Sequence, residues 1–264
     1  MAIASPSTFE DTGYPGPIEL SQDEFLDEVF APHYRPGEHV TFIGPTNSGK
    51  TTIAFKMLDR VATPELPVVI LVLKPKDSTV DDEAAKYGFR RIDHWPPTKR
   101  EWRPWKSEFG GKIRGWVFWP RQSLRNIRRD DSMLSYEFGK VMTDCYRAGN
   151  RVVFVDEAHA VQNDLKLRPE MDAMLMRGRS LGCGGWFATQ RPRNVTLNMY
   201  SQAEHLVLFR TSDERDADVY RQIGGVDPTI VSEAVWGLER FEFVYIGRTK
   251  GVDGDATLAI VKGT

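Results

Sequence analysis

Residues 44–51 read GPTNSGKT and match the pattern Gly-x-x-x-x-Gly-Lys-[Ser/Thr]. The run HVTFI at 39–43 predicts a buried strand before the pattern, and residues 50–61 carry apolar side chains at helical spacing after it. A glycine-rich turn between a strand and a helix directs backbone amides, and the positive end of the helix, at one point. The stretch therefore predicts a phosphate-binding loop in an α/β fold.

The residue types in this loop suit a nucleotide with a magnesium ion. Lys50 supplies a mobile positive charge for the β- and γ-phosphates, and the Thr51 hydroxyl can ligate the metal. We therefore expect ATP and Mg²⁺ as cofactors, against the alternative of a glycine turn that precedes a helix by chance. The residues expected to contact the nucleotide are Gly44, Pro45, Thr46, Asn47, Ser48, Gly49, Lys50, Thr51 and Thr52.

The stretch RVVFVDEAHAV at 151–161 is the second motif. Its apolar residues predict a buried strand that ends at Asp156, whose carboxylate then joins Thr51 as a metal ligand. The adjacent Glu157 can orient and deprotonate the attacking water. The alternative is a solvated turn that happens to contain two acids, and His159 is interpreted as a structural residue of that turn.

The remaining pattern predicts short strands that alternate with helices. Such an order gives a mostly parallel sheet covered by helices on both faces. We expect an N-terminal arm and acidic helix over 1–36 and a single domain over 37–264. The further strands are expected at 68–73, 116–119, 185–189, 206–209 and 241–246, and the further helices at 134–148 and 169–180.

Composition sets outer limits on function. The chain has 264 residues, which suits one sizeable α/β domain, and its net charge of −2 favours no class of partner. Its two cysteines form neither a disulfide framework nor a metal-binding spacing. With no long apolar run and no signal-peptide pattern, we expect a cytoplasmic protein without a membrane span, in the host cytoplasm or virion-associated if the chain is viral.

Charge is distributed unevenly along the chain. Residues 1–38 carry a net charge of −7, whereas residues 86–129 carry +10 and contain five of the seven tryptophans. We interpret 86–129 as a basic, tryptophan-rich insertion that can contact DNA, because Lys and Arg attract phosphates and aromatic rings stack on bases. The alternatives are packing of the insertion on the domain and attachment to an acidic partner. The expected DNA contacts are Lys99, Arg100, Arg103, Lys106, Lys112 and Arg114.

A third stretch, GRSLGCGGWFATQRP at 178–192, completes a resemblance. Together with the phosphate loop and the Asp-Glu strand, it resembles the FtsK/HerA superfamily of DNA-pumping P-loop ATPases, which includes viral genome-packaging ATPases. The resemblance covers roughly residues 37–250 and implies a RecA-like (ASCE) sheet. It also implies that Gln190 is a polar sensor. The resemblance further implies an arginine that reaches a neighbour's nucleotide, with Arg179 as the first candidate and Arg177 as the second.

The function implied by the resemblance is ATP hydrolysis that drives translocation of double-stranded DNA, in viral genome packaging or a related DNA transfer. It further implies a homo-oligomeric ring, a hexamer by analogy, with a capsid or portal protein as a further partner.

Three other interpretations stay open. The letters Asp-Glu-Ala-His also name a helicase class, but those helicases use two RecA-like lobes, and roughly 110 residues follow Asp156. A terminase-type ATPase is the second, although no acidic nuclease cluster follows the domain. The third is an assembly factor that binds ATP as a switch; Glu157 and Gln190 favour turnover instead.

Overall fold

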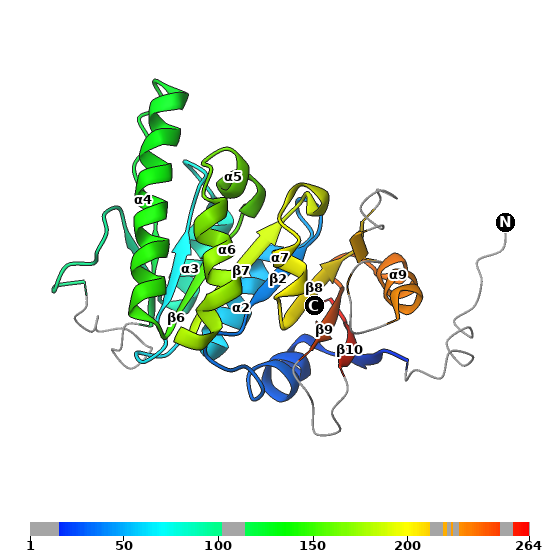
Figure 1. Cartoon of the computed structure of the whole chain (residues 1–264). Helices are drawn as coiled ribbons and strands as arrows, with labels where there is room; N and C mark the ends of the chain where they lie inside the picture. Colours follow the sequence, from blue (N-terminus) through cyan, green and yellow to red (C-terminus); the bar gives the residue numbers. More distant parts are fainter. Residues whose placement is uncertain are drawn as a thin grey trace.

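The computed structural model describes residues 16–101, 114–211, 219, 220, 223, 227–248 and 256–263. A ten-stranded sheet in the order β1-β10-β9-β8-β2-β7-β6-β3-β5-β4 runs through them (Figure 1). The strands from β8 to β4 are parallel, while β9 runs antiparallel to both β8 and β10. The predicted mostly parallel α/β sheet is confirmed. The strands are β1 (Ile18–Leu20), β2 (Val40–Ile43), β3 (Val68–Leu71), β4 (Arg90–Ile92), β5 (Gly115–Phe118), β6 (Arg151–Val155), β7 (Cys183–Thr189), β8 (His205–Phe209), β9 (Phe243–Gly247) and β10 (Thr257–Val261).

Helices cover both faces of this sheet, as expected for buried parallel strands. Alternate residues of a strand point to opposite layers: Val68 and Ile70 of β3 pack with α2 and α3, whereas Val69 and Leu71 pack with α4, α5 and α6. The helices are α1 (Gln22–Glu24), the π-helical η2 (Phe25–Phe30), α2 (Lys50–Val61), α3 (Ser78–Tyr87), α4 (Ile127–Ala148), α5 (Ala158–Asn163), α6 (Arg168–Arg177), α7 (Asn198–Ser201) and α9 (Pro228–Gly237), with 3₁₀ turns η3 (Gly178–Leu181) and η4 (Pro192–Asn194).

The helix expected at 134–148 begins earlier, at Ile127. Asn126 caps it, because its side chain accepts from the Arg129 amide at 3.1 Å. Five of the seven added residues, 127–133, are polar, so apolar periodicity did not indicate them. With 22 residues, α4 is about 33 Å long and extends past the sheet edge at its amino end (Figure 1).

The segment expected to be an arm and a helix and the stretch interpreted as an insertion both contribute strands to the main sheet, among them the strand expected at 116–119. Residues 18–20 form β1, and Phe25 of η2 is fully buried against Phe243, with ring centroids 5.4 Å apart. In the stretch 86–129, β4 and β5 are strands of the sheet, and Trp116 and Trp119 are buried. The central part of that stretch, residues 102–113, lies outside the described residues.

No helix in the described part of the chain is both long and apolar enough to cross a membrane.

Candidate nucleotide site

The GPTNSGKT loop joins β2 to α2 at the carboxyl edge of the parallel strands, where ligands of open α/β sheets bind. The Gly44 amide donates to the Thr189 carbonyl at 3.2 Å, which fixes the loop to the end of β7. Gly49 has a φ of 98°, a left-handed conformation that glycine adopts without strain. At Gly44 a Cβ would lie 2.6 Å from the Phe209 Cβ, so this position is also restricted to glycine.

Lys50 lies buried at the start of α2, with 6% of its surface exposed. Its ammonium group donates to the carbonyls of Gly44 at 2.8 Å and Pro45 at 2.7 Å. Burial lowers the pKa of Lys50 to about 8, against the opposing effect of the carboxylates of Asp156 and Glu157. A buried cation whose hydrogen-bond acceptors are only loop carbonyls is well suited to receive an anionic phosphate.

The hydroxyl of Ser48 is buried and has no hydrogen-bond partner among the described residues. Buried polar atoms in proteins are nearly always paired, so this hydroxyl points to a ligand of the loop. It fits a phosphate oxygen, which would accept its proton.

Thr51 and Asp156 form the second part of the site. The Thr51 hydroxyl donates to Asp156 Oδ1 at 2.9 Å, which places two oxygen ligands side by side, one in the first turn of α2 and one after the end of β6. Burial raises the pKa of Asp156 above its usual range. These are the ligand types that magnesium prefers, so the pair fits the expected metal.

Gln190, at the end of β7, lies between the phosphate loop and Glu157. Its amide nitrogen donates to Glu157 Oε2 at 2.7 Å, and its amide oxygen accepts from the Thr46 hydroxyl. Burial first, and then the neighbouring charge of Asp156, raise the pKa of Glu157. The structure thus brings Thr46, Gln190 and Glu157 into one hydrogen-bonded chain.

The pocket beside the loop also contains residues that sequence reasoning missed. Lys74 follows β3, and its ammonium group lies 2.9 Å from Asp77 Oδ2 and 3.9 Å from Asp156 Oδ2. The sequence did hold a signal, because KPKD at 74–77 follows an apolar strand at the same sheet edge. Arg240 and Phe241 gave no such signal: they precede β9, and only its antiparallel direction brings them to this edge.

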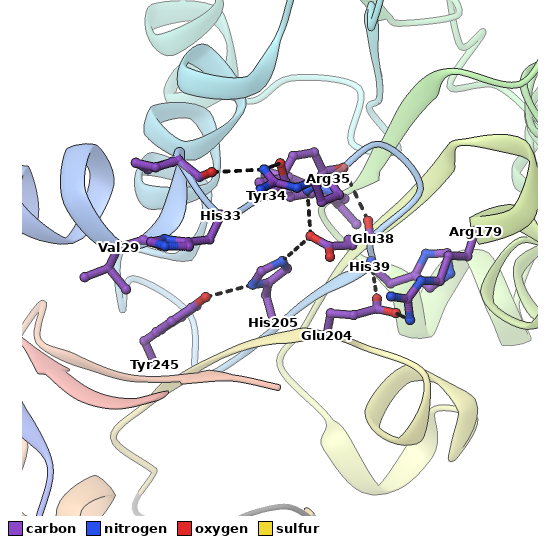
Figure 2. A network of polar contacts seen from close by, with 12 residues as sticks. Val29, His33, Tyr34, Arg35, Glu38, His39, Arg179, Glu204, His205 and Tyr245 are labelled. Atoms are coloured by element: carbon purple, nitrogen blue, oxygen red, sulfur yellow. Dashed lines mark hydrogen bonds and ion pairs between the residues drawn. The ribbon is translucent and has the colours of Figure 1, made fainter. Parts of the chain in front are cut away.

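The two candidate arginines lie elsewhere. Arg179 belongs to η3, which precedes β7, so it sits at the amino edge of the strands, opposite the phosphate loop. Its side chain lies beside Glu204 and His39 (Figure 2). Its guanidinium donates to Glu204 Oε1 at 2.7 Å, and the other oxygen of Glu204 accepts from the His39 amide at 2.7 Å. Arg177 lies nearby, with its guanidinium 5.9 Å from the centre of the Tyr146 ring. Neither arginine belongs to the nucleotide pocket of its own chain.

The expected DNA contacts have mixed placements. Lys99 and Arg100 are exposed. Arg114 is half-buried, and its guanidinium donates to Asp59 Oδ1 at 2.7 Å and to the Tyr87 carbonyl at 2.9 Å. A DNA contact by Arg114 would break these bonds, which join the residue before β5 to α2 and α3. Arg103, Lys106 and Lys112 lie outside the described residues.

No protein-family model matches this chain, and no curated protein matches it at a significant level. Solved structures do. The genome-packaging NTPase B204 of Sulfolobus turreted icosahedral virus 2, in complex with AMPPCP, has a TM-score of 0.56 at 18% identity, over 88% of this chain and 100% of that one.

Two further structures are similar. VirB4 of Thermoanaerobacter pseudethanolicus has a TM-score of 0.60 at 10% identity, over 86% of this chain and 89% of that one. The cytoplasmic domain of the type VII secretion ATPase EccC of Thermomonospora curvata has a TM-score of 0.52 at 15% identity, over 87% of this chain and 26% of that one. These likenesses extend over most of this chain and confirm the predicted fold, a mostly parallel α/β sheet shared with ATPases of known structure.

Proposed function

We propose that this protein hydrolyses ATP to move double-stranded DNA, in viral genome packaging or a related DNA transfer. The observation that carries the proposal is the chain Thr46–Gln190–Glu157 beside the Thr51–Asp156 pair. It joins the phosphate loop to a candidate base, an arrangement that serves turnover and that simple nucleotide storage does not need. The shared fold with a genome-packaging NTPase supports the choice of process.

Each residue has a defined task in this proposal. Lys50 and the Ser48 hydroxyl bind phosphate oxygens, and Thr51 and Asp156 would hold Mg²⁺, which supplies positive charge to the β- and γ-phosphates. Glu157 accepts the proton of the attacking water, and the raised pKa of its carboxylate makes it a stronger base than an exposed glutamate. Gln190 orients Glu157 and links it to the phosphate loop through a hydrogen bond from Thr46.

The proposal includes a ring, with a hexamer as the working assumption, in which Arg179 serves the site of a neighbour. Two observations support this. The Arg179 side chain is 63% exposed, and it lies at the edge of the sheet opposite its own phosphate loop. A guanidinium that reaches the γ-phosphate stabilises charge that spreads over its oxygens in the transition state. A capsid or portal protein is the proposed docking partner.

The decisive experiment is an ATPase assay with and without linear double-stranded DNA. We expect Mg²⁺-dependent hydrolysis that DNA stimulates. An ATP hydrolysis rate that does not change when DNA is added would contradict the proposed DNA-moving function. ATP binding without hydrolysis would instead favour the assembly switch.

A further inference from the structure

The amino end of α4 and the loop before it form an exposed projection, which we call the α4 tip and define as residues 121–129. The tip follows β5 at the carboxyl edge of the sheet, on the same side as the nucleotide site. Because α4 is about 33 Å long and β5 only about 13 Å, the tip stands clear of the sheet (Figure 1).

Asp130 gives the tip a fixed shape. Its buried carboxylate accepts from the Ser123 amide at 3.0 Å, the Ser123 hydroxyl at 2.9 Å and the Leu124 amide at 2.8 Å. These bonds hold Leu124 at a φ of 58°, which is uncommon for a residue with a branched side chain. The loop therefore displays Leu124 outward, with 66% of its surface exposed.

The surface of the tip carries charge of one sign. It has four arginines and no acid in nine residues, and all four arginines are exposed. Arg121 pairs with Asp93 at 2.8 Å, whereas Arg125, Arg128 and Arg129 form no ion pair within the described part of the chain. Ile127 lies among them with 78% of its surface exposed.

We propose that the α4 tip is a contact surface for the phosphodiester backbone of double-stranded DNA. Charge of a single sign fits a polyanion, whose every repeat offers a phosphate to an arginine. Leu124 and Ile127 suit contact in the minor groove, where several DNA-binding proteins insert apolar side chains such as leucine and isoleucine. The choice of DNA as partner rests on the proposed function; the shape and charge of the tip do not.

The test measures binding of the full chain to a short fluorescein-labelled duplex by anisotropy, over a range of salt concentrations. The variant is Arg125→Ala/Arg128→Ala. The control is Arg147→Ala/Arg168→Ala, which removes the same charge from exposed arginines outside the tip. We expect the tip variant to bind at least about tenfold more weakly, and its salt slope to fall by about 1.8, since each lost phosphate contact removes about 0.9.

A second variant, Leu124→Asn, tests the apolar part, because asparagine tolerates the left-handed backbone of this position. We expect weaker binding with an unchanged salt slope. Basal ATPase activity should stay at the wild-type level in both tip variants.

The outcomes separate this inference from the proposed function. If the wild-type protein binds duplex and the tip variant binds equally well, or loses no more than the control, the tip is not the DNA contact and an acidic protein becomes the better partner. If the wild-type protein binds no duplex, the DNA-moving function fails together with this inference.

Discussion

The two edges of strands β2 and β8 hold different sets of buried polar groups. At the carboxyl edge, the Ser48 hydroxyl has no partner among the described residues, and Lys50 has only loop carbonyls. At the amino edge, His205 is fully buried and bonds Glu38 at 3.0 Å and Tyr245 at 2.7 Å (Figure 2). The His205 network is satisfied within the fold, although His39 Nε2 near it also lacks a partner among the described residues. At the carboxyl edge, the unpaired Ser48 hydroxyl and the buried Lys50 lie together in the loop, where a phosphate would complete their hydrogen bonds.

Arg179 belongs to the amino edge but extends from it into solvent. Glu204 is held by the His39 amide, and it in turn holds the Arg179 guanidinium. We therefore expect the carboxyl edge to receive the nucleotide and the amino edge to present a fixed arginine to another subunit. Substitutions at the two edges test that division.

Replacement of Lys50 by alanine should abolish both nucleotide binding and turnover, because the phosphates lose their main positive partner. Isothermal titration with ATP and a phosphate-release assay measure the two effects, and circular dichroism checks the fold. A folded K50A protein with normal ATPase activity would show that the nucleotide site does not lie at the carboxyl edge.

Replacement of Arg179 by alanine should lower turnover by about 10³–10⁵-fold while ATP binding persists. Mixing R179A with K50A subunits should restore some hydrolysis, because an intact arginine then meets an intact pocket at some interfaces. If R179A alone keeps full activity, Arg177→Ala is the next variant to test. Equal turnover by a dilute wild-type monomer would rule out action between subunits.

Replacement of Glu157 by glutamine should slow hydrolysis by about 10²–10⁴-fold and leave ATP binding intact, since the amide keeps the shape but cannot accept a proton. In the wild-type enzyme, the raised pKa of Glu157 means that activity falls with decreasing pH before an ordinary glutamate would titrate. A wild-type rate in E157Q would show that another group is the base.

Replacement of Glu204 by glutamine should lower turnover by about fivefold. This corresponds to about 1 kcal/mol, the upper end of the stabilisation that a partly exposed ion pair provides. The glutamine oxygen can still accept a hydrogen bond from the His39 amide, so the contact between the starts of β2 and β8 should persist. The ATP dissociation constant of E204Q should match wild type, and K50A subunits should rescue E204Q as they rescue R179A. Loss of ATP affinity would indicate general damage rather than a misplaced arginine.

The smallest effect concerns pH. Because burial lowers the pKa of Lys50 to about 8 in the empty pocket, half of the sites lack the charge at pH 8, which should weaken ATP binding about twofold relative to neutral pH. The affinity should decline further as pH rises. Titrations across this range, with K50R as the non-titrating control, measure the effect. A flat affinity would mean that Lys50 keeps its proton.

Much of the nucleotide edge could be predicted from sequence, because its residues follow local rules. Glycines, a lysine and a hydroxyl at fixed spacing define a loop, and apolar runs that end in polar residues define the strands around it. Gln190 was found through resemblance rather than through any rule of periodicity.

The features that were missed depend on distant pairing. Arg240 and Phe241 reach the pocket only because β9 is antiparallel, and Glu204 meets Arg179 only because β8 lies beside β2. In η2, Phe25 and Phe30 are five residues apart, a spacing outside the α-helical pattern, so their burial was not anticipated. The direction of each strand and the identity of its neighbours depend on the whole sheet. Patterns within a single sequence do not contain that information.

The pairing of β1 with β10 has a consequence for how the chain is made. Ile18 lies opposite Ala259, so β1 can pair only after the ribosome has added the much later residues of β10. Until then Phe25 and its neighbours lack the β9 residues that bury them. The parallel centre can assemble during synthesis, but this margin closes only after β9 and β10 have been made. Until then the apolar residues of η2 stay exposed to chaperones and proteases.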